Sequence, residues 1–283
     1  MRAKHYTAPL LLCAAAATAA AAALLLACAG ESSRQGTVLT LTTILAGDQR
    51  SAEERARDEY RHPKETLLFF GIRPEMSVLE VWPEPGWYTE VLAPLLRDKG
   101  RYYAAVIAAD PGNKHITQRL EEYRDKLASR ADLYDRVSVV SFPLDGGELV
   151  PPNSLDMVVT FRNIHNWMAR GAAPQAFAIM FRALRPGGVL GVVEHRGNPS
   201  APQDPQAKSG YVNEDYAIRL IEAQGFKLVA KSEVNANPKD TKDYEQGVWT
   251  LPPTYRLGAR DHDKYAAIGE SDRFTLRFVK PRG

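Results

Sequence analysis

The sequence predicts an α/β fold: a doubly wound, mostly parallel seven-stranded sheet with helices on both faces. Three observations predict it. Short and nearly continuous apolar runs, such as 77–82 and 155–161, have the length and composition of buried strands. Segments of helical character separate most of these runs. The composition, 45% hydrophobic and 25% charged, is that of an ordinary globular protein.

The segment 51–70 is expected to be helical and to precede the first strand. Ser51 is placed as an N-cap, with Glu53 and Glu54 in the first turn, where they suit the helix dipole. Pro63 predicts two helices or a kink. Gly71 is expected to end the second piece.

The remaining elements follow from apolar runs and helix signals. The strands are expected at 77–82, 102–108, 137–142, 155–161, 189–194, 226–233 and 274–279. The helices are expected at 88–96, 116–129, 174–184 and 213–224, with a turn at 186–188. Because no clear helix separates the last two strands, the seventh is open to antiparallel pairing.

The N-terminus has the pattern of an export signal. Arg2 and Lys4 precede an uncharged, alanine-rich run, so residues 1–27 are expected to be a signal peptide. The sequence Leu-Leu-Ala before Cys28 resembles a bacterial lipobox, which implies lipidation of Cys28. An uncleaved anchor and ordinary cleavage around Cys28 are the alternatives. We expect an exported lipoprotein, anchored in the membrane and facing the periplasm, with 28–50 as a tether and 51–283 as one domain.

Charge and cysteine usage exclude several classes of protein. The chain has 36 Lys and Arg against 34 Asp and Glu, and Arg2 and Lys4 account for the excess. A nucleic-acid partner relying on bulk positive charge is therefore not expected. The only cysteines are Cys13 and Cys28, so no disulfide framework is expected in the body of the chain. The histidines are scattered without metal-ligand spacing, and no metal site is expected.

Two segments resemble the class I S-adenosylmethionine (SAM)-dependent methyltransferases. The first is Val-Leu-Glu-Val at 78–81, followed by a tight turn that ends at Gly86. The second is the helix, Leu-Arg-Pro-Gly-Gly turn and strand of 181–194. The resemblance covers roughly residues 65–235. It implies a Rossmann-like fold, SAM as cofactor and methyl transfer to a small molecule.

The same resemblance implies a set of cofactor-binding residues. Glu80 stands at the family's acidic position, and Gly86 is the last glycine of its loop, whereas Trp82 occupies an earlier glycine position. Asp110 is the nearest acid for the ribose hydroxyls, and Asp145 for the adenine amino group. Both aspartates are equally placed as turn residues.

The aromatic residues around this loop leave two interpretations open. Trp82, Trp87 and Tyr88 are placed to stack on adenine or on the sulfonium. They are equally consistent with core and rim positions.

The segment after the fourth strand carries the expected chemistry. The pair Arg162-Asn163 resembles the corresponding segment of the ubiquinone/menaquinone C-methyltransferases. Arg162, Asn163 and His165 are the expected catalytic residues, with His165 as general base, because histidine titrates near neutral pH. The alternative for His165 is a hydrogen bond within the next helix. Glu194 and His195 end the fifth strand on the same sheet edge, where a pair in which Glu194 orients the His195 ring is expected and a solvated rim is the alternative.

Two long connections are expected to cover this edge. They are 197–211 and 235–258, and the alternative for the second is an extended hairpin. The sequence thus favours a small-molecule methyltransferase of O- or C-methylating type. The degenerate glycine loop and the export signal favour the alternative, a non-catalytic envelope lipoprotein that binds a ligand or partner.

Overall fold

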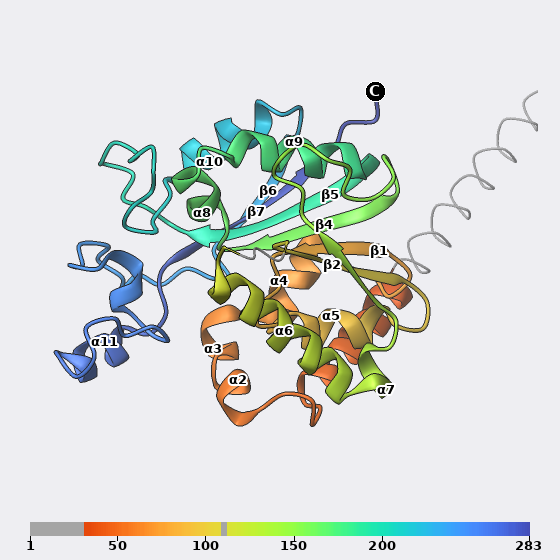
Figure 1. Ribbon diagram of the computed structural model, residues 1–283, viewed down its shortest axis with the longest axis horizontal. Coiled ribbons are helices and arrows are strands. Elements are labelled where there is room, and N and C mark those ends of the chain that lie inside the picture. The colour runs from red at the N-terminus through yellow and green to blue at the C-terminus, as the bar shows by residue number, and fades with distance from the viewer. Residues whose placement is uncertain (1–30, 109–111) are drawn as a thin grey trace, which may run out of the picture.

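The computed structural model describes residues 31–108 and 112–283 and contains a seven-stranded sheet with helices on both faces (Figure 1). The strands are β1 (Ser77–Val81), β2 (Arg101–Val106), β3 (Val137–Ser141), β4 (Leu155–Phe161), β5 (Leu184–His195), β6 (Lys227–Ser232) and β7 (Arg273–Val279). The helices are α2 (Ala52–Ala56), α3 (Asp58–Arg61), α4 (Pro63–Phe70), α5 (Thr89–Leu96), α6 (Lys114–Ser129), α7 (Ala131–Tyr134), α8 (Ile164–Ala169), α9 (Ala173–Ala183), α10 (Glu214–Glu222) and α11 (His262–Ile268). The seven strands and the main helices lie where the sequence predicts them, within a few residues.

The sheet is mixed rather than simply parallel. Its strand order is β3-β2-β1-β4-β5-β7-β6. The pairs from β3 to β5 are parallel, whereas β7 lies antiparallel between β5 and β6. The helix between β6 and β7, α11, lies beyond the end of the sheet and not across one of its faces (Figure 1), and an antiparallel pair needs no crossover helix. The expectation of a mostly parallel sheet therefore holds for the strands from β3 to β5, and not for β6 and β7.

Two apolar layers cover the sheet. Figure 1 shows α9 and α10 on one face and α4, α5 and α6 on the other. Phe177 of α9 and Phe274 of β7 are fully buried in the first layer, and Leu67 of α4 and Leu92 of α5 in the second. Burial of this apolar surface from both sides is the main force that holds the layers together.

The N-terminal cover begins earlier than expected. Residues 31–45 are helical, and Leu41 is fully buried, so this part of the expected tether belongs to the folded domain. Ser51 caps α2 in a reciprocal capping box with Glu54, and Gly71 ends α4 at φ 82°. The interruption expected at Pro63 is present, because α4 starts there.

Other segments differ from the expected elements. Residues 186–188, expected as a turn, belong to β5, in the stretch where its register with β4 shifts. The segment 235–258 is not a hairpin but a series of turns with the 3-10 helix η1 (Gly247–Thr250). Among the described residues, no helix is long and apolar enough to cross a membrane. The expected signal peptide and Cys28 lie outside the described residues.

Candidate active site

The carboxyl ends of β4 and β5 meet the beginning of β7. Arg162 follows β4 directly, Glu194 and His195 end β5, and the antiparallel register pairs His195 with Arg273 of β7. Residues just before β7 therefore lie at the same sheet edge as residues just after β4 and β5. This is the edge at which ligands gather in doubly wound sheets.

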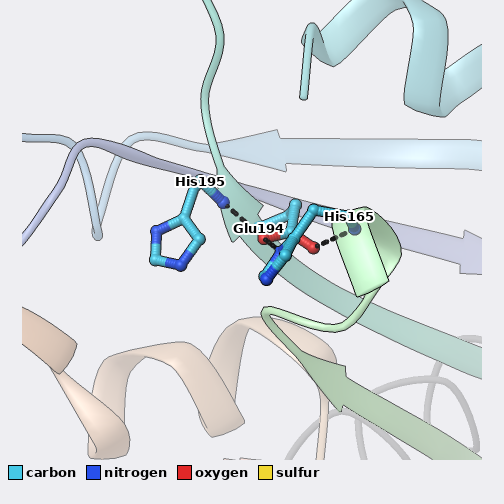
Figure 2. A group of neighbouring side chains, drawn as sticks. All are labelled: His165, Glu194 and His195. Carbon is cyan, nitrogen blue, oxygen red and sulfur yellow. Dashed lines mark hydrogen bonds and ion pairs between the residues drawn. The ribbon is translucent and has the colours of Figure 1, made fainter. Parts of the chain in front are cut away.

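Glu194 and His165 form a buried pair at this edge (Figure 2). His165 lies in α8 and is 7% exposed, and Glu194 is fully buried. The Glu194 carboxylate accepts hydrogen bonds from His165 Nδ1 at 3.1 Å, His165 N at 3.3 Å and His195 N at 2.9 Å. The expected pairing of Glu194 with the His195 ring is wrong, because the carboxylate orients the His165 ring instead. Within the described chain, His165 Nε2 has no hydrogen-bond partner.

The His195 ring has a different partner. Its Nδ1 lies 2.5 Å from Ser271 Oγ, and its ring centroid is 5.5 Å from that of His165. Burial lowers the pKa of His195 well below its usual range, and the nearby Arg162 and Arg273 guanidinium groups lower it further. His195 is therefore neutral at pH 7 and serves as a hydrogen-bonding group.

A cavity of about 130 Å³ lies against these side chains. Its polar wall contains Arg162, His165, His195, Thr254, Glu270 and Ser271, and its apolar wall contains Val248, Trp249, Pro252 and Pro253. Trp249 stands edge-on to His165, with ring centroids 6.0 Å apart. The long connection 235–258 thus covers the site, as the sequence predicts. The connection 197–211 supports it, since Val248 N donates to Ser209 O at 2.8 Å.

Asn163 does not line the cavity. It is 6% exposed, and its amide donates to Val81 O at 2.9 Å and to Thr160 Oγ1 at 3.1 Å. The side chain therefore ties the end of β1 to the end of β4. The geometry places Asn163 in a positioning role, and its expected catalytic role is not supported.

Two histidines and a carboxylate raise the question of a metal. The ligand atoms of His165, Glu194 and His195 all lie within 4.8 Å of one another, which sequence spacing does not reveal. This donor set suits divalent transition metals. However, the Glu194 oxygens already accept three N–H groups, and Arg162 and Arg273 contribute positive charge. The surroundings therefore favour an anion over a cation.

Glu80 is not turned toward a ligand. It is 3% exposed and accepts a 2.6 Å hydrogen bond from Tyr102 Oη. Tyr102 Oη also lies 2.9 Å from Thr89 Oγ1, which contacts Tyr123. Burial raises the pKa of Glu80 to about 8, against the lowering effect of the Tyr102 hydrogen bond. In this conformation Glu80 anchors α5 and α6 to the sheet.

The aromatic residues of the β1–α5 segment pack within the protein. Trp82 is half-buried, edge-on to Trp167, with the Arg170 guanidinium 5.2 Å from its ring. Trp87 lies beneath the Arg61 guanidinium at 4.7 Å. Tyr88 stacks on Phe161, with ring centroids 3.6 Å apart. For Trp87 and Tyr88 the structure thus supports the core interpretation over the stacking one.

The backbone of this segment keeps the conformations that glycine favours. Trp82 adopts φ 52° and Gly86 adopts φ 98°. A Cβ on Gly86 would lie 3.1 Å from Lys126 Cδ and 3.2 Å from Tyr123 Cε2. Gly86 therefore allows close approach of α6, a role that the sequence does not reveal.

Glu84 belongs to the loop after β1, and its side chain reaches the end of β2. Its Oε1 accepts a 3.3 Å hydrogen bond from Ile107 N, whereas its Oε2 is buried without a partner in the described chain. Burial raises the pKa of Glu84. The sequence does not reveal this position, because Glu84 reaches the end of β2 from the loop that follows β1.

The two remaining residues expected to bind the cofactor are Asp145 and Asp110. Asp145 is exposed in a turn, and its Oδ1 accepts from Gly147 N at 3.4 Å. This contact supports the turn interpretation. Asp110 lies outside the described residues.

The contributions of Glu270 and Ser271 are missing from the sequence prediction. Both precede β7 and face the cavity. Antiparallel pairing of the last strand with β5 brings them there. The polar sequence Glu-Ser-Asp at 270–272 is the only local feature that points to these residues. It indicates a site only once the pairing of β7 with β5 is known.

Comparison with solved structures shows which fold this is. A SAM-dependent methyltransferase from Aquifex aeolicus superposes with a TM-score of 0.54 at 16% identity, over 80% of this chain and 93% of that chain. The [4+2]-cyclase SpnF gives 0.57 at 16% identity, over 90% and 96%. The glycopeptide N-methyltransferase MtfA gives 0.51 at 16% identity, over 79% and 91%. The chain has the class I SAM-dependent methyltransferase fold.

The likeness concerns the methyltransferase fold and not a particular reaction. No protein-family model matches the sequence. No curated protein matches it either. SpnF, named as a cyclase, shares the fold with proteins named as methyltransferases. The chemistry of this chain has to be argued from its own site.

Proposed function

We propose that this protein is a SAM-dependent methyltransferase that acts on a small molecule, with His165 as general base. The observation that carries the proposal is the His165–Glu194 pair beside a cavity at the carboxyl edge of a class I methyltransferase fold. The small cavity favours a small acceptor, and a general base favours O-methylation or methylation of an acidic carbon.

The tautomer of His165 supports its role as base. Because the Glu194 carboxylate accepts at Nδ1, the proton of a neutral ring resides on Nδ1, and the lone pair on Nε2 is free. Nε2 would take the proton of the acceptor as the acceptor bonds to the methyl carbon and the carbon–sulfur bond breaks, with its electron pair leaving on sulfur to give a neutral thioether. Glu194 then stabilises the imidazolium and keeps its orientation.

The β1–α5 segment fits SAM through side chains more than through backbone. Pro83 and Pro85 offer no N–H, and Gly86 N already donates to Pro83 O at 2.7 Å. The Oε2 of Glu84 has no partner in the described part of the chain and is placed to accept from the ribose hydroxyls. The buried Nε1 of Trp82, likewise without a described partner, is a further donor. SAM supplies an electrophilic methyl group on a sulfonium.

Covering side chains keep water away from the reacting atoms. Trp249 and the prolines of the 252–253 pair form the apolar wall of the cavity. Alignment of the acceptor against the methyl group is then the main contribution of the protein, because the reaction is an in-line displacement.

Binding of the cofactor tests the proposal. The full chain, purified in mild detergent, is titrated calorimetrically with S-adenosylhomocysteine and with SAM. A micromolar Kd, about −8 kcal/mol, is expected. Absence of binding at about 1 mM would reject the enzyme in favour of the non-catalytic ligand-binding alternative, which the packed aromatics of this segment favour.

We further propose that the protein works at the membrane after export, tethered through lipidated Cys28. Ser33 and Arg34, near the start of the described chain, lie beside Gly71 and Arg73, which precede β1. The first described residues therefore lie at the sheet edge opposite the cavity, which supports an anchor that leaves the site accessible. Cys28→Ser is expected to abolish labelling by a radioactive fatty acid, and Cys13→Ser to preserve it; labelling of Cys28→Ser would reject the anchor.

A further inference from the structure

Arg162 lines the candidate site, and its side chain has no partner among the described residues. It is held in the left-handed backbone region at φ 62° and lines the cavity beside His165. Backbone strain at a non-glycine residue clusters at functional sites. Within the described residues, the Arg162 guanidinium makes no hydrogen bond and no ion pair. Its five N–H donors are therefore available to a ligand.

The carboxylate in the cavity wall is already occupied. Glu270, in the cavity wall, is 4% exposed. It pairs with Arg57 at 2.7 Å and with Arg61 and Arg273 at 3.1 Å each. Burial opposes its ionisation, but the surrounding arginines hold the pKa of Glu270 at about 2. Glu270 is thus ionised and satisfied by groups other than Arg162.

Positive charge is in excess around the cavity. Four guanidinium groups face two carboxylates, Glu270 and Glu194, and the second is used by His165. The Nη2 atoms of Arg57 and Arg61 are buried without partners in the described chain. Burial lowers the pKa of Arg61 to about 9. Excess buried charge is costly unless a counter-charge accompanies it.

The volume and the lining of the cavity limit the kind of molecule that can carry the counter-charge. Its volume of about 130 Å³ holds about four water molecules at their liquid density. One wall is polar and carries Arg162, whereas the other is formed by Trp249 and prolines. The shape suits a charged group joined to a small apolar body.

We propose that the cavity binds a small organic anion, whose carboxylate or phosphate rests on Arg162 and whose reacting atom faces His165. The acceptor of the proposed methyl transfer is then an anionic compound, an assignment that rests on the proposed function. Binding of the anion itself does not require the cofactor. Arg162 recognises the charged group through two N–H donors, and the neutral His195 ring provides a further hydrogen bond.

Matched probes test this assignment in the full chain without cofactor. The probes are inorganic phosphate, 4-hydroxybenzoate and its neutral analogue 4-hydroxybenzamide, and binding is measured by calorimetry and thermal shift. Both anions are expected to bind with Kd values of about 1 mM or lower, and the amide at least tenfold more weakly. Equal binding of acid and amide, or no saturable anion binding at about 10 mM, would overturn the proposal.

Arginine variants locate the anion. Arg162→Gln is expected to weaken anion binding about tenfold or more, with partial recovery in Arg162→Lys. Arg219→Gln, on the exposed face of α10 with its side chain 68% exposed, is the matched control and should bind as the wild type does. Unchanged anion affinity in a folded Arg162→Gln protein would reject the assignment.

A cofactor titration separates this proposal from the proposed function. S-adenosylhomocysteine also carries a carboxylate, so its Kd is measured in the wild type and in Arg162→Gln. Similar values in both proteins support an acceptor site. Loss of cofactor affinity with unchanged anion binding would assign Arg162 to the cofactor instead. Anion binding by a wild type that binds no cofactor would reject the methyltransferase and leave the anion site standing.

Discussion

The Glu194 carboxylate lies 3.1 Å from Nδ1 of His165 and also accepts from the backbone N–H of both His165 and His195. One buried carboxylate therefore joins α8 to the end of β5. Three N–H donors fix its position, so the imidazole has a single well-supported orientation. The base of the proposed reaction is held by the scaffold and not by a loop.

Loss of either partner is expected to remove catalysis. His165→Ala lacks the base, and Glu194→Gln loses the charge that stabilises the imidazolium. We expect each to lower the rate of methyl transfer by about 10²- to 10⁴-fold. Transfer of labelled methyl from SAM into small-molecule extracts measures the rate, and calorimetry measures the Kd of S-adenosylhomocysteine, which should stay within about threefold.

The control for these variants is His115→Ala, because His115 is exposed on α6. It should transfer methyl groups at the wild-type rate. If His165→Ala retains full activity, His165 is not the base and the cavity has another role.

Glu84→Gln tests the ribose contact. The Oε2 atom of Glu84 is buried at the end of β2 and has no partner among residues 31–108 and 112–283, so a hydroxyl donor there gains a charge-assisted hydrogen bond. The substitution is expected to weaken S-adenosylhomocysteine binding by about tenfold. Glu121→Gln, on the exposed side of α6, provides the comparison. An unaltered Kd in Glu84→Gln would place the ribose elsewhere.

Sequence features within a few residues of one another predict most of the helices and strands. Ser51 with Glu54 marks a helix start, Gly71 marks a helix end, and the apolar run 155–161 marks a central strand. Each depends on residues a few positions apart. The position of β7 between β5 and β6 depends on pairing between distant segments, so the sequence leaves its direction open.

The site was only partly predictable for the same reason. Arg162 and His165 follow β4 directly, and strand ends are known to gather at one edge. The choice between His165 and His195 as partner of Glu194 depends on the rotation of α8 and on ring orientation. Glu270 enters the site through strand pairing alone.

Tyr211→Phe is expected to loosen the cover of the site. Tyr211 Oη donates to the buried Asp240 carboxylate, which also accepts from Asp272 N at 2.8 Å and Lys242 N at 2.9 Å. Loss of the hydroxyl should lower the free energy of unfolding by about 1–2 kcal/mol. Urea unfolding measures the change, and hydrogen exchange should rise in 235–258. Unchanged stability and exchange would show that this hydrogen bond does not hold the cover.

Glu80 predicts a pH dependence of stability. Its pKa of about 8 lies above the unfolded value of about 4.3, so between these values the folded state binds the extra proton. The contribution is fully present below the unfolded pKa and is lost as pH rises through 8. In Glu80→Gln this loss is absent, so the stability of the variant relative to wild type should rise by about 1 kcal/mol or more from pH 5 to pH 8.5. Parallel stability curves for the two proteins would contradict a raised pKa.

Glu270→Gln removes the one carboxylate that three arginines share. Gln keeps the shape but leaves Arg57, Arg61 and Arg273 without a counter-charge, so we expect a loss of about 3–5 kcal/mol in the free energy of unfolding. The pKa of about 2 means that the wild type keeps this stabilisation above the unfolded pKa and loses it as pH falls toward 2. Acid should therefore reduce the difference between the two proteins.

Glu245→Gln is the matched control for this variant, because Glu245 pairs with Arg260 on the surface with both side chains more than half exposed. Its expected cost is below about 1 kcal/mol. Added phosphate should restore part of the stability of Glu270→Gln, because an anion replaces the lost charge in a cluster that remains cationic. If Glu270→Gln is as stable as Glu245→Gln at pH 7, the arginines do not depend on Glu270, and the excess positive charge at the cavity is smaller than the geometry indicates.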